Sequence, residues 1–295
     1  MIIYHADDYG ISVNASKDIL SLVEKGALNS FSIMPNMSCF KECMELLTPV
    51  LDAHRNSLTI ALHINLFEGH CCADPKDIPL LVNPDGMFQP EWTWFFWHSY
   101  LWGRNKLRKQ LAIEIAAQIK QFLIAMPMDY VLCLDSHQHS HMIPVVWDAL
   151  KDVVTQNKYH VQYVRISREP LVPYLRCPYL YRTYSNINII KNLVIQFCSI
   201  HTRLHPIIKQ QGKYRMWGLI MGGTMDFMRI QKLMPLFKKY GKDPDTLELL
   251  FHPGLLLQTE VTEEYNKREF VNAETSPCRE TEHRSLLRLS NLPTD

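Results

Sequence analysis

Short apolar runs rich in β-branched residues alternate with amphipathic stretches along most of the chain, and this alternation constrains the fold more than any other feature. Seven runs have the length and composition of buried strands: residues 2–5, 30–34, 58–64, 130–134, 161–166, 216–221 and 247–251. Helical periodicity predicts helices at residues 15–25, 40–51, 106–124, 144–154, 227–240 and 281–289. Strands that alternate with helices form parallel sheets.

The predicted fold class is α/β, a distorted (β/α) TIM-like barrel with about seven parallel strands. The chain has 295 residues, 47% of them hydrophobic, which is enough for a large core. We expect a single barrel domain over residues 1–295, with excursions at about 70–104 and 167–215. The second excursion contains an apolar helical run at 187–204 and is expected to cover the barrel mouth. A doubly wound open sheet is the alternative, since it also gathers its strand ends at one edge.

Charge and segment length limit the partners that the sequence predicts. Lys and Arg total 31 against 30 Asp and Glu, a formal net charge of +1, so no overall field favours nucleic acid or an anionic membrane. No apolar run approaches the length of a membrane span, and the chain opens on a predicted strand instead of a secretory leader. We therefore expect a cytoplasmic protein without nucleic-acid partners or a membrane span, for which a homo-oligomer stays open.

Adjacent carboxylates end the first predicted strand. The opening apolar run passes into Asp7 and Asp8 and then Gly10, which is typical of a strand that ends in a site. Two neighbouring acids repel each other when both are ionised, and a bound cation or a raised pKa on one of them relieves that repulsion. The pair therefore favours a metal site.

Histidines at the ends of later strands would complete such a site. His63, His137 and His252 each lie where a predicted strand ends, which is where a (β/α) barrel places its chemistry. An Asp/His/His set suits zinc or another divalent ion and leaves a position for water or substrate. The second carboxylate can then act as general base and a further histidine as general acid. His139 and His141 lie beside His137, and geometry alone does not select the ligand.

Four motifs resemble, in order, those of the YdjC-like carbohydrate deacetylases, which include chitooligosaccharide deacetylases. They are HADDYGIS at residues 5–12, ALHINLFEG at 61–69, LDSHQHSHMIP at 134–144 and ELLFHPG at 248–254. The resemblance spans residues 1–254 and reaches Arg279 and Glu282. It is specific, because several dissimilar motifs recur in order at plausible distances. It implies a (β/α) barrel hydrolase that removes acetyl groups from N-acetylated sugars.

The resemblance also implies roles for individual residues. Asp7 resembles the catalytic base of the family, and His252 resembles its general acid. Asp8, His63 and His137 resemble its metal ligands. Family members are described with Mg²⁺, whereas the ligand types favour Zn²⁺ or another transition metal. We therefore expect one divalent metal ion, whose identity stays open.

Three further positions bear on the substrate. Arg165, at the end of a predicted strand, resembles a family position that binds near the substrate, and a surface ion pair is the alternative. The first motif has His5 and Tyr9 where the family commonly has Asn and Phe. His5 either adds a polar contact near the site or lies beneath it. Thr224 stands where a His often precedes the Met, so a substrate contact there differs from the family pattern.

We expect a metal-dependent hydrolase that cleaves the linear amide C–N bond of N-acetyl groups on an oligosaccharide or glycolipid sugar. One alternative is a related metallohydrolase that acts on a cyclic amide or another acyl group. The other is a noncatalytic sugar- or metal-binding protein, and the retention of both Asp7 and Asp8 counts against it. The aromatic run at residues 92–102 is either a platform that stacks on sugar rings or a segment that packs its own apolar side.

Overall fold

The computed structural model describes residues 1–54, 57–208, 214–240, 246–265 and 267–292. Within these residues the strands form one parallel sheet in the order β5-β4-β3-β2-β1-β7-β6. The strands are β1 (Ile2–Tyr9), β2 (Ser30–Ile33), β3 (Thr59–Ile64), β4 (Leu132–Ser136), β5 (Val161–Val164), β6 (Tyr214–Trp217) and β7 (Thr246–Phe251). All seven predicted strands are confirmed, with ends that differ by a few residues.

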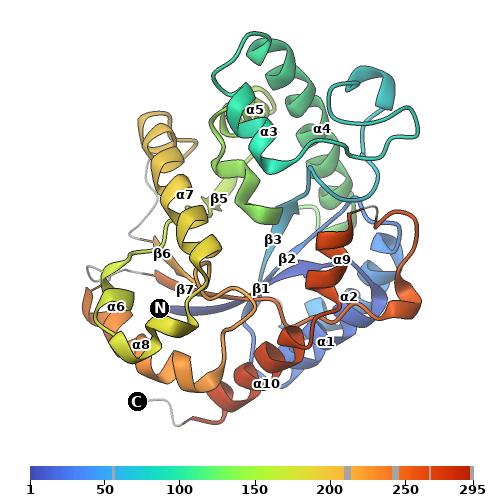
Figure 1. Ribbon diagram of the computed structural model, residues 1–295. Helices are drawn as coiled ribbons and strands as arrows, with labels where there is room; N and C mark the ends of the chain where they lie inside the picture. The colour runs from blue at the N-terminus through green and yellow to red at the C-terminus, as the bar shows by residue number, and fades with distance from the viewer. Residues whose placement is uncertain (55–56, 209–213, 241–245, 266, 293–295) are drawn as a thin grey trace.

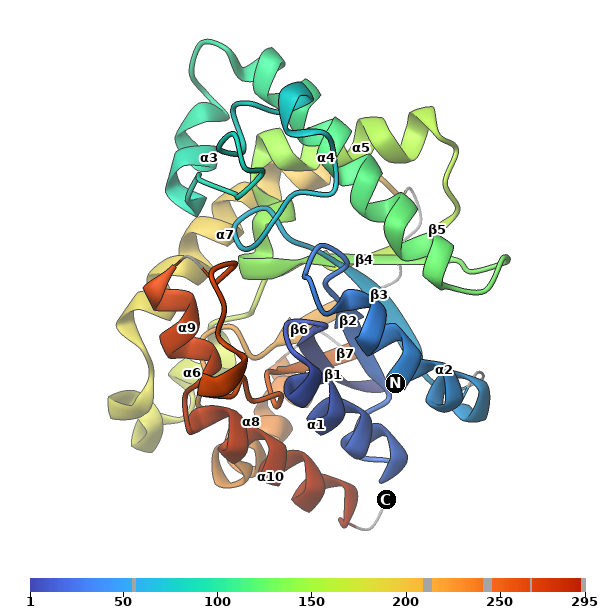
Figure 2. The same ribbon diagram turned by 90° about the vertical axis from the view of Figure 1, so that its right-hand side faces the viewer.

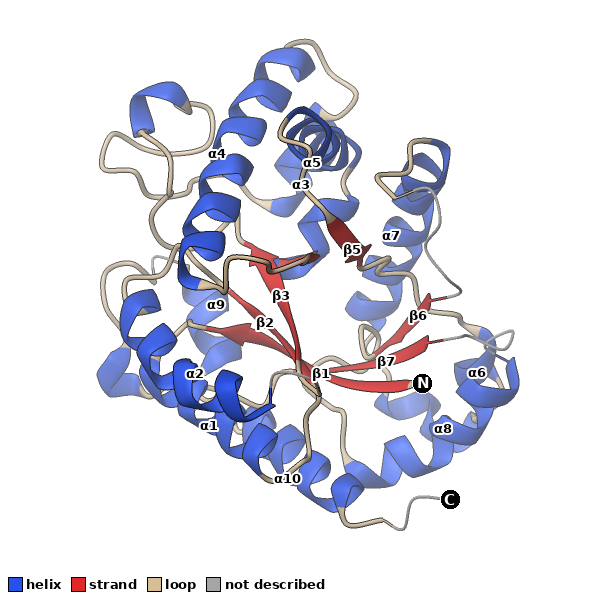
Figure 3. Cartoon of the chain, turned by 180° about the vertical axis from the view of Figure 1, so that it is seen from behind, coloured by secondary structure: helices blue, strands red, loops and turns tan. Residues whose placement is uncertain are grey.

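The strand order decides between the two predicted architectures. From β6 through β7 and β1 to β5, sheet neighbours follow one another as they do around a (β/α) barrel, without the reversal of a doubly wound sheet. The sheet curls into a half-barrel with helices outside it, and β5 and β6 form its two edges (Figure 3). The predicted distorted barrel class is confirmed.

The predicted helices also form. They are α1 (Val13–Glu24), α2 (Phe40–His54), α4 (Arg104–Ala125), α5 (Pro144–Gln156), α8 (Phe227–Tyr240) and α10 (Cys278–Ser290). Ser12 caps α1, because its Oγ accepts a hydrogen bond from Ala15 N at 3.1 Å. The inner face of α1 buries Ile19, Leu22 and Val23 against the sheet, so the amphipathic pattern sets the direction in which the helix faces.

Further segments lie beyond this alternation. They are η1 (Pro75–Asp77), α3 (Trp92–His98), α6 (Val172–Leu175), η3 (Pro178–Thr183), α7 (Asn186–Leu204), η4 (Gln258–Glu260) and α9 (Arg268–Glu274). α3 lies in the first predicted excursion, and α6 and α7 lie in the second. In Figure 1 α7 is the yellow helix on the left, and Figure 2 shows α3, α7 and α9 together on its left side. Among the described residues, no helix has the length and apolarity that crossing a membrane requires.

The turn after β6 depends on Gly218. The sequence predicts a strand to residue 221, but β6 ends at Trp217 because Gly218 has a φ of 133°, a conformation that L side chains rarely adopt. A Cβ atom at Gly218 would lie 2.5 Å from Leu250 O and 2.9 Å from Leu250 Cβ. The absence of a side chain therefore lets the chain leave β6 in contact with β7.

Gly218→Ala is expected to lower the free energy of unfolding by about 2–5 kcal/mol, from backbone strain and overpacking together. Gly26→Ala is the matched control, because Gly26 also has a positive φ, of 67°, but open space where the Cβ would lie. It should cost only about 1 kcal/mol. Urea unfolding of both variants checks this expectation, and equal losses would contradict it.

Candidate active site

A bulge in β1 brings the two adjacent carboxylates to one place. Side chains of neighbouring strand residues normally point to opposite faces. Asp8, however, has a φ of 69°, and the pairing of β1 with β2 shifts register between Ala6 and Tyr9. Both carboxylates therefore approach the same imidazole: His63 Nε2 lies 3.4 Å from Asp8 Oδ1 and 4.0 Å from Asp7 Oδ2. Bulges that re-aim side chains in this way are frequent next to active sites.

Asp8, His63 and His137 form a buried triad that could hold a metal ion. His137 opens the short helix η2 (His137–Met142) after β4, and its Nδ1 lies 3.1 Å from Asp8 Oδ1. One ligand atom from each of the three residues lies within 4.8 Å of the others. Among the described residues, the Nε2 atoms of His63 and His137 are buried without a hydrogen-bond partner. Such atoms are costly to bury, so the donor set fits a divalent cation.

The charges around His63 also favour a cation. Burial alone lowers the pKa of His63, but the carboxylates of Asp7 and Asp135 outweigh burial and raise the pKa to about 10. Burial likewise tends to raise the pKa of Asp8, yet the adjacent His137 and His63 rings hold it well below its usual range. Carboxylates that stabilise a proton on a ring would equally stabilise a metal ion in its place.

Asp135, in β4, belongs to the site although the sequence analysis did not select it. Its Oδ1 lies 2.7 Å from His63 Nδ1, and its Oδ2 lies 2.8 Å from an Arg165 nitrogen. A carboxylate on the second ring nitrogen fixes the orientation of a metal-binding histidine and increases its basicity. The signal was present in the sequence, because Asp135 lies two residues before His137 at the end of the same strand.

Arg165 lies beneath the site. Its side chain is fully buried, so it is not the surface ion pair considered as an alternative. Its terminal nitrogens donate to both oxygens of Asp7, at 2.9 and 3.1 Å, and its Nε lies 2.7 Å from Glu248 Oε1. Burial tends to raise the pKa of Asp7, but Arg165 and His63 hold it well below its usual range. Direct contact of Arg165 with a substrate stays a prediction.

His252 follows β7 and lies next to Asp7. Its Nε2 is 4.0 Å from Asp7 Oδ2, and its ring is partly exposed. Its backbone N–H donates to Glu282 Oε2 at 2.6 Å, and its Nδ1 lies 3.8 Å from the same oxygen. Burial alone lowers the pKa of His252, but the Glu282 carboxylate outweighs burial and raises it. This combination suits a ring that carries a proton near neutral pH.

Two other residues considered from the sequence, Arg279 and His5, also contact the acids of the site. Arg279, from α10, donates to Asp8 Oδ2 at 3.3 Å and pairs with Glu274 of α9. His5 lies in β1, where its Nε2 is 3.2 Å from Asp7 Oδ1 and its Nδ1 is 2.7 Å from Ser30 Oγ. His5 therefore makes a polar contact with an acid of the pair, although it is fully buried.

The remaining histidines of the motif, His139 and His141, are not members of the triad. His141 is buried between Ser136 Oγ, at 2.5 Å, and the backbone oxygen of Arg165, at 2.7 Å, which is a structural role. Gln138 and His139 both adopt left-handed backbone conformations, with φ values of 52° and 55°. The segment is therefore not extended, and the alternate histidines do not share one side.

The side chains of the aromatic run at residues 92–102 differ in their surroundings, and the sequence left open whether this run packs its own side or stacks on sugar rings. Trp92 stacks on Phe96 and Trp94 stacks on His98, as in a segment that packs its own side chains. Trp97 and Trp102 are 62% and 98% exposed. No contact shown for these side chains reaches the triad, so a sugar platform stays a prediction.

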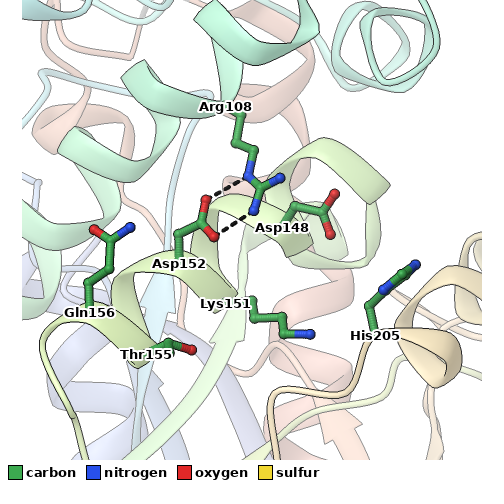
Figure 4. Close-up of a pocket in the computed structure, with 7 residues that line it drawn as sticks. All are labelled: Arg108, Asp148, Lys151, Asp152, Thr155, Gln156 and His205. Carbon is green, nitrogen blue, oxygen red and sulfur yellow. Dashed lines mark hydrogen bonds and ion pairs between the residues drawn. The ribbon is translucent and has the colours of Figure 1, made fainter.

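A separate surface cavity of about 350 Å³ lies between α4, α5 and the end of α7. Figure 4 shows the side chains around it, including the ion pair between Arg108 and Asp152. Asp148 pairs with His201 at 2.8 Å. No residue of the triad and neither His252 nor Asp7 lines this cavity. We therefore place the candidate active site by its chemistry, at the ends of β1, β3, β4 and β7.

Comparison with known proteins agrees with the motifs. A protein-family model described as YdjC-like protein matches residues 1–288. A carbohydrate deacetylase of Xenopus laevis is 25% identical over 276 residues, which cover 86% of this chain and 80% of that protein. A carbohydrate deacetylase of Thermoanaerobacter pseudethanolicus is 27% identical over 172 residues, which cover 58% of this chain and 63% of that protein.

One solved structure supports the fold. It is the crystal structure of an Enterococcus faecalis protein provisionally assigned to cellobiose-phosphate cleavage, with 14% identity and a TM-score of 0.62 over 98% of this chain and 94% of that one. At this identity the likeness concerns the fold alone. The match of the family model to nearly the whole length confirms what the four motifs predicted: this chain belongs to the YdjC-like protein family.

Proposed function

We propose that the protein is a metal-dependent carbohydrate N-deacetylase. The observation that carries the proposal is the approach of both carboxylates of the β1 bulge to His63, which places a second acid, outside the ligand set, beside a triad that could hold a metal. A protein that only binds sugar or metal has no need of the second acid. The names of the relatives support an N-acetylated sugar as substrate.

The metal would be held by Asp8, His63 and His137. A divalent ion bound there would supply polarisation of the acetyl carbonyl and a more acidic water. Two imidazole ligands favour zinc or a similar transition metal, whereas the family resemblance favours magnesium. Asp135 and Ser32 orient His63, since both lie within 2.9 Å of its Nδ1.

Asp7 and His252 would move the protons. Asp7 is ionised and can accept the proton of the attacking water as general base. Arg165 donates hydrogen bonds to both carboxylate oxygens of Asp7, so we infer that it positions the base. His252, held in its protonated form by Glu282, would donate a proton to the departing amine. Together the two residues complete a hydrolysis in which water gives acetate and a free amino sugar.

The two acids should respond differently to substitution. Asp8→Ala is expected to lose bound metal, whereas Asp7→Asn should keep it and lose turnover by about 10²–10⁴-fold, the usual effect of removing a general base. Metal analysis of purified protein, with acetate release from N-acetylated sugars, measures both effects. Asp77→Asn, an exposed acid in η1, is the control. Equal metal loss in the Asp7 and Asp8 variants would rule out this division of roles.

The histidines should divide in the same way. His63→Ala and His137→Ala are each expected to abolish stoichiometric metal binding, because each removes a ligand. His139→Ala and His141→Ala should reduce it only partly, through the packing that supports the triad. The test is the metal content of each variant. It is compared between samples that have the same folded fraction, as judged from a melting curve of each variant. Normal metal content in the His137 variant would show that the triad is wrongly assigned.

The Glu282 carboxylate should control the pH profile. A general acid must be protonated, so kcat/KM falls as pH rises through the pKa of His252. Glu282 raises that pKa, so Glu282→Gln should move the alkaline limb to lower pH by about one unit. Glu280→Gln, on an exposed acid of the same helix, should leave the limb in place. An unmoved limb in the Glu282 variant would contradict the acid role of His252.

A further inference from the structure

Helix α7 turns its apolar side chains toward solvent. Five of them are between 47% and 71% exposed: Ile190, Leu193, Phe197, Ile200 and Leu204. The opposite side of the helix buries polar residues, among them Asn192, Ser199 and Thr202. A surface helix normally faces its apolar side toward the core. α7 also buries Ile195 and Cys198 in the core, so it is apolar on its inner and on its outer side, and the outer side calls for something that covers it.

The exposed residues form one continuous stripe. They recur at alternating intervals of three and four positions from Ile190 to Leu204, and residues at these intervals are neighbours on one face of a helix. The stripe runs along most of the 19-residue helix. A contiguous apolar surface of this kind marks an interaction site more often than single exposed residues do.

The turn between α3 and α4 extends this surface. Trp97, Tyr100, Leu101 and Trp102 are all more than half exposed. Burial and the nearby Cys198 thiol raise the pKa of Tyr100, which places this turn beside α7. Both α3 and α7 also contact α5, and in Figure 2 α3 lies above α7. We call this turn and the α7 stripe together the apolar flank.

The apolar flank carries basic side chains but no acid: α7 contains the exposed Lys191 and Arg203, and neither α7 nor the turn between α3 and α4 contains Asp or Glu. Residues 92–113 and 170–225, which contain it, hold 11 of the 31 Lys and Arg and none of the 30 Asp and Glu. Exposed basic side chains in these segments are Lys106, Lys109, Arg176, Arg182, Lys191 and Arg203. Among the described residues, none of these six forms an ion pair with a carboxylate. These two segments are thus basic although the whole chain has a net charge of only +1.

We propose that the apolar flank docks on the surface of an anionic lipid bilayer. Aliphatic and aromatic side chains would enter the boundary between headgroups and acyl chains, while Lys and Arg would meet anionic headgroups. A second copy of the chain is a poorer fit, because a symmetric contact would bring basic side chains against basic side chains. A nucleic acid would match the charge but would leave the aliphatic stripe in water.

α7 contacts η2, which begins at His137, so docking would bring the active site near N-acetylated sugars that form lipid headgroups, one of the two substrate types expected from the sequence. This consequence rests on the proposed deacetylase function. The docking itself does not, because no residue of the apolar flank belongs to the triad or to the acid–base pair. Binding to vesicles therefore tests the surface without any measurement of activity.

Sedimentation of the full chain with vesicles is the experiment. The protein is expected to bind vesicles of phosphatidylcholine with phosphatidylglycerol, to bind phosphatidylcholine alone much more weakly, and to release as salt rises. Leu193→Gln with Phe197→Gln should lower partitioning by about ten-fold or more, from lost apolar burial. Lys191→Glu should lower it by about five-fold or more, since each basic residue near the surface contributes about 1 kcal/mol.

Matched controls share the chemistry but lie elsewhere. Ile124→Gln removes an exposed apolar residue at the far end of α4, and Lys17→Glu reverses an exposed charge on α1. Both should bind vesicles as the unchanged protein does. Absence of binding to the anionic vesicles would overturn the proposal, as would equal losses in flank and control variants. Self-association that depends on Phe197, without vesicle binding, would assign the surface to a second copy and also overturn it.

Discussion

The buried guanidinium of Arg165 is the contact on which the site depends most. It follows β5, at one edge of the half-barrel, and pairs with Asp7 of β1, Asp135 of β4 and Glu248 of β7. One cation thus ties together strands from both sides of a sheet whose edges do not close. Removal of one partner from such a buried network is costly, by about 3–5 kcal/mol in comparable cases, because it leaves a charge uncompensated. The half-barrel and the position of the base are therefore maintained by the same interaction.

One Arg165 side chain does not neutralise all the acids that surround it. This shortage of positive charge explains why the site favours a cation. Asp7, Asp8 and Asp135 lie together with Arg165, and Arg279 adds one further cation from α10. The remaining negative charge raises the pKa of His63 to about 10 and favours any cation that can displace its proton. The unpartnered ring nitrogens of the triad would supply the ligands. The affinity proposed for a metal thus comes from the excess of acids, whereas the low pKa of Asp7 comes from the neighbouring Arg165 and His63.

Sequence reasoning found the site because of one geometric rule, that a parallel barrel gathers its strand ends. This rule gathered Asp7, Asp8, His63, His137 and His252 at one rim, and the family resemblance selected Asp8, His63 and His137 among them as the ligands. It could not show that β1 continues through Asp7 and Asp8 to Tyr9, since a left-handed residue inside a strand leaves no clear pattern. It also missed Asp135, because the role of Asp135 depends on which ring nitrogen of His63 its carboxylate faces. Periodicity located α7 within one residue at its start, but periodicity does not reveal which side of a helix meets the protein.

The charge of a whole chain proved a poor guide to its surface. Electrostatic fields in physiological salt fade over about 8 Å, so a partner senses only the charges close to its own point of contact. The excess of acids elsewhere in the chain cancels the basic segments in the sum but does not screen them in space. Where a helix combines an exposed apolar stripe with basic side chains and no acid, as α7 does, local composition is a better guide to a partner than net charge. The flank would attract an anionic surface, whereas the triad would attract a cation, so the two sites need local electrostatic fields of opposite sign. Because such fields fade over about 8 Å, both can exist in one molecule.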